Sequence, residues 1–236
     1  MSDDRAVRVG VAFARQGSAE PAARMCGACV EILDVSGAGV TIMSGVNSGP
    51  VCSSDERMGR LEDLQFSLGE GPCRDAYNSG QPINEPDLER PVPGRWPAYT
   101  SAALEIGARG VFAFPLIVAG MRVGVLTLYQ DIPGSLSIEQ TADSLVVADV
   151  IARTIVAIQS DSEMALLAAE LVDENAHRAE VHQASGMVSV QLAISIEEAL
   201  LRMRAHAFAT NRSVGSVAEL IVAQTLRLGD DRHGPG

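Results

Sequence analysis

Two β-rich runs separated by three residues constrain the fold of this chain more than any other feature. The runs VFAFPLIV (111–118) and RVGVLTLYQD (122–131) are almost continuously apolar, and the intervening AGM contains a glycine. Glycine supplies the positive φ that tight turns need, so the pattern predicts a β-hairpin. Near-continuous apolar content is typical of strands that are covered on both faces, and we therefore expect this hairpin at the centre of a sheet.

Helical and irregular segments precede the hairpin. The stretch AARMCGACVEILD (22–34) has apolar residues at helical spacing, and GAGVTIMSG (37–45) is typical of a short strand bounded by glycines. Residues 57–80 predict a helix, a glycine-rich loop and a short second helix, followed by the proline-punctuated segment 84–97. The N-terminal part is therefore expected to be an α+β domain, a central antiparallel sheet flanked by helices, whose irregular middle builds a pocket.

A long helix is expected after Ser137, which is a suitable N-cap. Its residues Leu145, Ala148, Ala152 and Ile155 follow the 3-4-3 spacing of a helix-pairing seam. Two interpretations stay open: the seam is a dimer interface, or the helix packs on its own sheet.

Three shorter helices are predicted beyond the polar stretch at 160–163, so the C-terminal part is expected to be all-α. The first runs from about Met164 to Leu192, and the third, VAELIVAQTLRL (217–228), follows Ser213. The second is IEEALLRMRAHAFA (196–209), which follows an S-x-x-E capping box formed by Ser195 and Glu198.

Charge is distributed unevenly along the 236 residues, whose formal net charge is −12. Residues 1–172 hold 12 arginines and 22 acids, whereas residues 173–236 hold 6 arginines and 8 acids. The stretch 199–218 contains three arginines and no acid, and no lysine occurs anywhere in the chain. This balance argues against a protein that coats nucleic acid non-specifically, yet it leaves a local basic patch.

No apolar run is long enough to span a bilayer, and the N-terminus lacks the pattern of a secretory signal, so we expect a cytoplasmic protein without a membrane partner. Its four cysteines, Cys26, Cys29, Cys52 and Cys73, are then expected to be reduced thiols. Core packing is favoured over a metal or redox role for Cys26-x-x-Cys29, and over a reactive thiol for Cys73. Because no histidine precedes His177, a histidine-ligated haem is excluded from the N-terminal domain. We assign no catalytic residue and no metal ligand, and the cofactor is unknown.

Two groups of side chains are candidates for binding. Those that could line an apolar pocket, or else belong to the core, are Cys73, Tyr77, Trp96, Tyr99, Phe112 and Phe114. Those in the C-terminal part that suit phosphates and stacked bases, or else form an ordinary solvated face, are Arg202, Arg204, His206 and Arg212.

Two segments carry a family resemblance. FSLGEGPCRDAYNSGQPI (66–83) and RWPAYTSAALEIGARGVFAFPLIVAGMRVGVLTLYQD (95–131) resemble the GAF domains of actinobacterial GAF-ANTAR proteins. Residues 181–223 are similar to the ANTAR module, a three-helix RNA-binding unit of transcription antiterminators. The resemblance implies an N-terminal extension (1–21), a GAF sensor domain (22–160), a helical linker (161–172), an ANTAR domain (173–228) and a disordered tail (229–236).

The resemblance further implies a signal-responsive homodimer whose ANTAR modules bind RNA hairpin loops and prevent a terminator from forming, with a possible small-molecule ligand at the GAF domain. Arg204, Asn211 and Arg212 are the implied RNA contacts. The implied helix-packing residues are Ala184, Gly186, Ala207, Val217 and Ala218. Where many ANTAR modules carry a basic residue, this chain has Ser185, which predicts weakened RNA binding. Two alternatives are a scaffolding GAF protein that has lost RNA binding and a cysteine-based methionine sulfoxide reductase of the GAF type.

Overall fold

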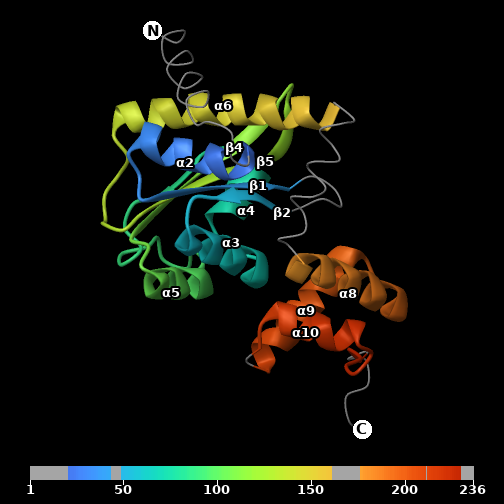
Figure 1. Cartoon of the computed structure of the whole chain (residues 1–236). Coiled ribbons are helices and arrows are strands. Elements are labelled where there is room, and N and C mark those ends of the chain that lie inside the picture. Colours follow the sequence, from blue (N-terminus) through green and yellow to red (C-terminus); the bar gives the residue numbers. More distant parts are fainter. Residues whose placement is uncertain (1–20, 44–48, 161–175, 211, 230–236) are drawn as a thin grey trace. The chain divides into compact units, whose positions relative to one another are not determined.

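The computed structural model describes residues 21–43, 49–160, 176–210 and 212–229. The chain divides into two compact units whose boundary along the sequence falls between Leu171 and Val172, and each unit is described by itself (Figure 1). Several sequence predictions lie outside the described residues. These are the N-terminal extension up to residue 20, the linker at 161–172, the RNA-contact residue Asn211, and the tail from residue 230.

A five-stranded antiparallel sheet forms the middle layer of the N-terminal unit. Its strands are β1 (Gly37–Ile42), β2 (Gly49–Ser53), β3 (Ile83–Glu85), β4 (Gly110–Val118) and β5 (Met121–Gln130), in the order β2-β1-β5-β4-β3. The predicted hairpin is confirmed as β4–β5, with β5 central in the sheet. Ala119 and Gly120 both have positive φ, 50° and 82°, the conformation that matches a two-residue turn to the twist of its strands.

Helices cover both faces of this sheet (Figure 1). On one face lie α2 (Pro21–Leu33) and α6 (Ile138–Ser160), and on the other lie α3 (Glu56–Leu68), α4 (Pro72–Ser79) and α5 (Pro97–Ile106). The α+β architecture is therefore as predicted. Strands β2 and β3 and helix α5 were not predicted from the sequence.

Successive residues of the central strands serve different faces, as the pleat requires. Phe112 and Phe114 of β4 and Leu126 and Leu128 of β5 pack in the main hydrophobic core with α2 and α6. Ala113, which lies between the two phenylalanines, and Val125, which precedes Leu126, pack with Cys73 and Ala76 of α4 on the opposite face. The sheet thus separates a large apolar core from a smaller, mixed interior on the side of α3 and α4.

Helix α6 packs on its own sheet through most of the predicted seam. Ala148, Ala152 and Ile155 are buried in the main core, whereas Leu145 is 49% exposed. Of the two interpretations left open by the sequence, packing of the helix on its own sheet is therefore the correct one for three of the four residues. The predicted cap is confirmed: the hydroxyl of Ser137 accepts from the backbone N–H of Gln140 at 3.0 Å, and the Gln140 side chain accepts from the Ser137 N–H.

The C-terminal unit contains α8 (Ala176–Leu192), α9 (Ile196–Ala209) and α10 (Val214–Val222). Helix α9 has the predicted bounds, and the Ser195 hydroxyl accepts from the N–H of Glu198 at 3.1 Å. Helix α10 begins directly after its cap Ser213 and ends before Gln224, whose positive φ of 57° breaks the predicted continuation to residue 228. In the described part of the chain no single helix could span a membrane, although the bent pair 180–192 and 196–209 meets the criteria of length and composition jointly.

Candidate functional site

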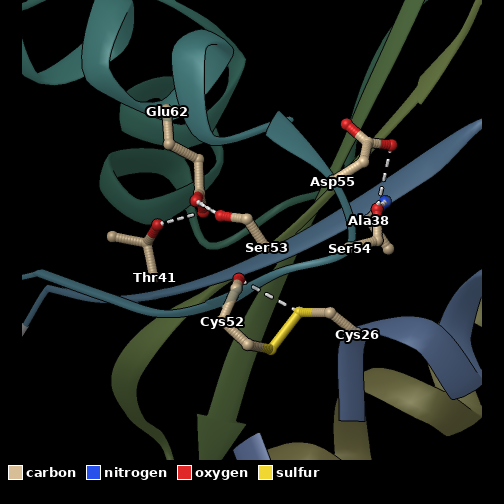
Figure 2. The surroundings of a disulfide bond; sticks show 8 residues. All are labelled: Cys26, Ala38, Thr41, Cys52, Ser53, Ser54, Asp55 and Glu62. Atoms are coloured by element: carbon tan, nitrogen blue, oxygen red, sulfur yellow. Dashed lines mark hydrogen bonds between the residues drawn. A yellow bond between two sulfur atoms is a disulfide. The ribbon is translucent and has the colours of Figure 1, made fainter. Parts of the chain in front are cut away.

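A buried carboxylate, Glu62 of α3, joins two strands on the α3 side of the sheet. The hydroxyl of Thr41 on β1 donates to its Oε1 at 2.7 Å, and the hydroxyl of Ser53 on β2 donates to its Oε2 at 2.5 Å (Figure 2). Glu62 is only 4% exposed. Gly39 makes room for it, since a Cβ at Gly39 would lie 2.7 Å from Oε1. The carboxylate is therefore held by fixed donors away from solvent.

Gln65, one turn further along α3, caps the start of α4. Its Oε1 accepts from the backbone N–H of Cys73 at 2.7 Å, which supplies the cap that Gly71 lacks. Cys73 is 5% exposed, and its Sγ lies 3.5 Å from Sδ of Met43. The Gln65 side chain is thereby fixed, with its amide nitrogen buried on the same side of the sheet.

Tyr99 of α5 and Thr127 of β5 bring two buried hydroxyls to this interior. Thr127 alternates with Leu126 and Leu128, which face α6, so its side chain points to the α3 side. Burial, reinforced by the charges of Cys73 and Glu62, raises the pKa of Tyr99 far above its usual range. The Tyr99 hydroxyl therefore stays protonated and lies in the neighbourhood of both groups. We call Glu62, Gln65, Tyr99 and Thr127 the polar cluster.

A second polar feature is an open cleft of about 590 Å³ at the ends of β1 and β5. The Tyr129 hydroxyl donates to Asp55 at 3.1 Å and the Ser36 hydroxyl donates to Asp131 at 2.9 Å. Burial and the neighbouring Asp55 carboxylate raise the pKa of Tyr129 to about 12. The cleft is lined by Ser36, Asp55, Glu56, Arg57, Arg60, Ile106, Tyr129 and Asp131.

Cys26 of α2 and Cys52 of β2 form a disulfide, which lies across the β1–β2 pair from Glu62 (Figure 2). The prediction of reduced thiols is wrong for this pair. Helix α2 packs on β2 and brings the two Cα atoms within 6.0 Å, a proximity that 26 residues of sequence separation do not reveal. Cys26 Sγ also lies 3.0 Å from the Cys52 carbonyl oxygen, a contact only, since a disulfide sulfur carries no proton.

The other two cysteines, Cys29 and Cys73, are buried thiols that do not take part in this disulfide. Burial raises the pKa of the Cys29 thiol to about 12, so this thiol is a core side chain, as predicted. Cys73 belongs to the smaller cluster with Ala76, Ala113 and Val125, which agrees with the packing interpretation.

In the C-terminal unit, α9 carries the arginine-rich surface. Arg202 pairs with Glu198 one turn earlier at 3.2 Å, so part of its charge is neutralised. Arg204 and His206 are half-buried, and Arg212 is exposed just beyond the helix. Phe208, which the sequence analysis did not single out, is 81% exposed. It is four residues from both Arg204 and Arg212.

Two known families match this chain. The model described as GAF domain covers residues 19–156, more than half of the sequence. The chain belongs to the GAF family. A second model, described as ANTAR domain, covers residues 169–222 and therefore all of α8, α9 and α10. Both are regulatory domains, and their order is the one that the sequence resemblance implied.

The fold of the GAF domain recurs in solved structures of low sequence identity. The GAF domain of a phosphoenolpyruvate-protein phosphotransferase from Coxiella burnetii is 17% identical, with a TM-score of 0.52 over 67% of this chain and 95% of that one. The corresponding domain from Acinetobacter is 11% identical, with a TM-score of 0.51 over 68% and 96%. These likenesses show the fold alone. No curated protein matches the chain.

The structure divides the predicted pocket residues of the GAF domain into two groups. Cys73, Tyr77 and Tyr99 lie on the α3–α4 side of the sheet. Trp96 is close to them, because its ring makes an edge contact with Tyr99 at 6.0 Å and its Nε1 donates to Asp75. In contrast, Phe112 and Phe114 belong to the main core on the opposite face, so grouping them in one pocket with the other four is wrong. An unbroken apolar run gave no indication of which face each phenylalanine serves.

Four of the five predicted packing residues of the ANTAR domain are buried: Ala184, Ala207, Val217 and Ala218. Gly186 differs, because a Cβ there would meet nothing within 4 Å among the described residues, so close helix approach does not explain this glycine. Ser185 is 1% exposed and its hydroxyl donates to the carbonyl of His182 at 2.8 Å. A side chain at position 185 therefore faces the interior of the helical unit.

Gln65 and Thr127 were missed by sequence reasoning, as were Glu62 and Phe208. The three cluster residues belong to segments that look like ordinary amphipathic helix and strand. Phe208 could have been found from the sequence, since it is an aromatic residue close to arginines on a predicted helix.

Proposed function

We propose that this protein is a signal-responsive RNA-binding regulator, in which a GAF sensor controls an ANTAR domain that binds RNA hairpin loops and prevents transcription termination. The observation that carries the proposal is the succession of the two regulatory domains in one chain. Locally, the acid-free stretch 199–218 supports it, because phosphate contacts from arginine dominate affinity for nucleic acid.

Arg204, Asn211 and Arg212 are the proposed principal RNA contacts, with Arg202 and His206 beside them. Arg212 is exposed to solvent, which favours it as an RNA contact. Arg202 is the weakest candidate for an RNA contact, because it is paired with Glu198. We add Phe208, because exposed aromatic rings beside arginines stack on unpaired bases, the form in which bases of RNA loops are presented.

The proposed regulator is a cytoplasmic homodimer that takes a small-molecule input at the GAF domain. Helix α6 is the last described element of that domain and leads towards the ANTAR domain along the chain. An input that alters how the helices around 138–180 pair between protomers would alter the spacing of two ANTAR modules. No catalysis is included, since two cysteines are bonded to each other and the remaining two are buried.

A binding assay with an RNA that carries two hairpins tests the effector half. Arg204→Ala and Arg212→Ala are each expected to weaken binding and to reduce its dependence on salt. Arg153→Ala is the matched control, because this exposed arginine is on α6 and is already paired with Asp149 at 3.0 Å. Unchanged affinity and salt dependence in both ANTAR variants would show that the arginine assignment is wrong.

RNA recovered with the protein from cells decides between the regulator and a scaffolding GAF protein. The regulator is expected to enrich RNAs with paired hairpins, and the double variant Arg204→Ala, Arg212→Ala is expected to lose them. No enrichment over that variant would favour the scaffold. Light scattering of the intact chain tests the homodimer separately, and a monomer at micromolar concentration would refute that part.

A further inference from the structure

Three buried polar atoms of the polar cluster have no hydrogen-bond partner among the described residues. They are Nε2 of Gln65, Oη of Tyr99 and Oγ1 of Thr127. The three side chains are 4%, 0% and 1% exposed. Buried polar atoms in native proteins nearly always find a partner, so three such atoms within one interior indicate a partner that is not part of the chain.

Several observations place these atoms in one interior. Gln65 Oε1 holds the backbone N–H of Cys73 at 2.7 Å, and Tyr99 lies within electrostatic range of Cys73 and Glu62. Thr127 is the register partner of Gly39, whose missing Cβ would be 2.7 Å from Glu62. Helix α3, helix α5 and strand β5 therefore each contribute one unpartnered atom to the interior on the α3 side of the sheet.

The floor of this interior is made of small residues. On the two strands beside Thr127, the register partners are Gly39 of β1 and Ala113 of β4. Neither has a side chain longer than a methyl group, so neither can reach the Thr127 hydroxyl with a polar group of its own. We therefore expect the partner of this hydroxyl to come from above the sheet.

The chemistry of the three groups defines what they would bind. The Gln65 amide nitrogen only donates, since the oxygen of that amide is already used, while the two hydroxyls both donate and accept. An acceptor oxygen satisfies the amide nitrogen, and an N–H donor beside it uses the accepting capacity of a hydroxyl, so a group that presents both can satisfy all three. The neighbouring Glu62 accepts from two hydroxyls, as a carboxylate does, and disfavours an anion.

We propose that Gln65, Tyr99 and Thr127 bind an uncharged small molecule that carries a cyclic amide or urea group, the edge that a pyrimidine base presents. This proposal names the chemical class of the input to the proposed regulator. Only the regulatory role of the ligand rests on the proposed function; binding of the ligand does not. Trp96 is the only tryptophan of the chain and its ring contacts Tyr99, so its emission reports occupancy of the site.

Titration of the full-length protein with uracil tests the proposal, and orotate, the same ring with a carboxylate, is the charged control. We expect a saturable change in Trp96 emission with uracil, at least tenfold weaker binding in Thr127→Val and in Gln65→Leu, and no saturable change with orotate. Absence of saturation with uracil up to its solubility limit overturns the proposal, as does a Thr127→Val variant that binds like the wild type.

The ligand-free protein supplies an independent readout. Thr127→Val removes an unpartnered hydroxyl, so the thermal midpoint is expected to rise by a few degrees, whereas Thr41→Val breaks the hydrogen bond to Glu62 and is expected to lower it. A fall in both variants means that a bound water satisfies Thr127, and it overturns the proposal. RNA binding is measured on the same preparation. A protein that binds RNA but not uracil refutes only this inference. A protein that binds uracil but not RNA refutes only the RNA-binding half of the proposed function.

Discussion

A Cβ added to Gly39 would lie 2.7 Å from the Oε1 atom of Glu62, a separation that folded proteins do not tolerate. We therefore predict that Gly39→Ala lowers the free energy of unfolding by about 1–3 kcal/mol, because the carboxylate must leave its two hydroxyl donors or the strand must shift. Gly59→Ala is the control: on α3 the nearest atom to its Cβ is at 3.9 Å, so alanine should stabilise that helix by about 0.5–1 kcal/mol. Chemical denaturation of both variants gives the comparison, and equal effects would contradict it.

The Cys26–Cys52 disulfide predicts a redox-dependent stability. Reduction, or the variant Cys52→Ala, is expected to lower the free energy of unfolding by about 2–4 kcal/mol, since a cross-link over 26 residues restricts the unfolded chain. Urea titrations with and without dithiothreitol measure this, and the reductant should have no effect on the double variant Cys26→Ala, Cys52→Ala. Equal stability of the oxidised and reduced wild type would show that the bond is absent or carries no stability.

Tyr129 predicts a loss of stability at alkaline pH. Its pKa is raised to about 12 in the folded protein, whereas an unfolded tyrosine has a pKa of about 10, so the folded state favours the protonated hydroxyl. This contribution is complete below pH 10 and declines as the pH rises towards 12. The difference in unfolding free energy between wild type and Tyr129→Phe should therefore be constant from pH 8 to pH 9.5 and shrink above that range. A difference that stays constant to pH 11.5 would contradict the shift.

Arg212 and Phe208 are predicted to affect RNA binding in different ways. Arg212→Ala should weaken binding and reduce the slope of log affinity against log salt by about 0.7–0.9, because one phosphate contact is lost. Phe208→Ala should weaken binding by about 1–3 kcal/mol with an unchanged slope, because stacking on a base releases no counterion. Filter binding at four salt concentrations distinguishes the two. Unchanged affinity in Phe208→Ala would exclude the stacking role, and a Phe208→Ala variant that loses dimerisation instead would assign the ring to a protein interface.

Ser185 is predicted to tolerate no basic residue. Because its side chain is buried and bonded to His182, Ser185→Arg should destabilise the ANTAR domain by about 3 kcal/mol or more instead of strengthening RNA binding. The adjacent Gly186→Ala is the matched control, since its Cβ would meet open space and should stabilise α8 by about 0.5–1 kcal/mol. Circular dichroism melting follows both. A stable Ser185→Arg protein that binds RNA more tightly would contradict this interpretation. It would instead support the prediction from the sequence that Ser185 weakens RNA binding.

Local signals were sufficient for the central hairpin and for most of the helices, and they were insufficient for the site. Ser137 and Ser195 located two helix starts, and the Ala119–Gly120 turn located the central hairpin. Helix α5 could have been found too, since Pro97 opens it and Gly107, with φ of 101°, ends it.

The polar cluster has no comparable local signal. Glu62 and Thr127 are 65 residues apart in the sequence, and they come to the same side of the sheet because Glu62 lies over Gly39 of β1, the register partner of Thr127 on β5. The disulfide was not predicted for the same reason. The expected cellular compartment of a protein does not indicate which thiols its fold brings together.

Strand β5 gives the GAF domain a wall that is a single backbone thick between its two interiors. Thr127 belongs to one interior, and the residues bonded to it on either side, Leu126 and Leu128, belong to the core beneath α6. Peptide planes are stiff, so any rotation or translation of the backbone at Thr127 must also move both leucines. A signal that arrives at the polar cluster would therefore need no relay of side chains to reach the long helix, because both interiors are attached to the same three residues.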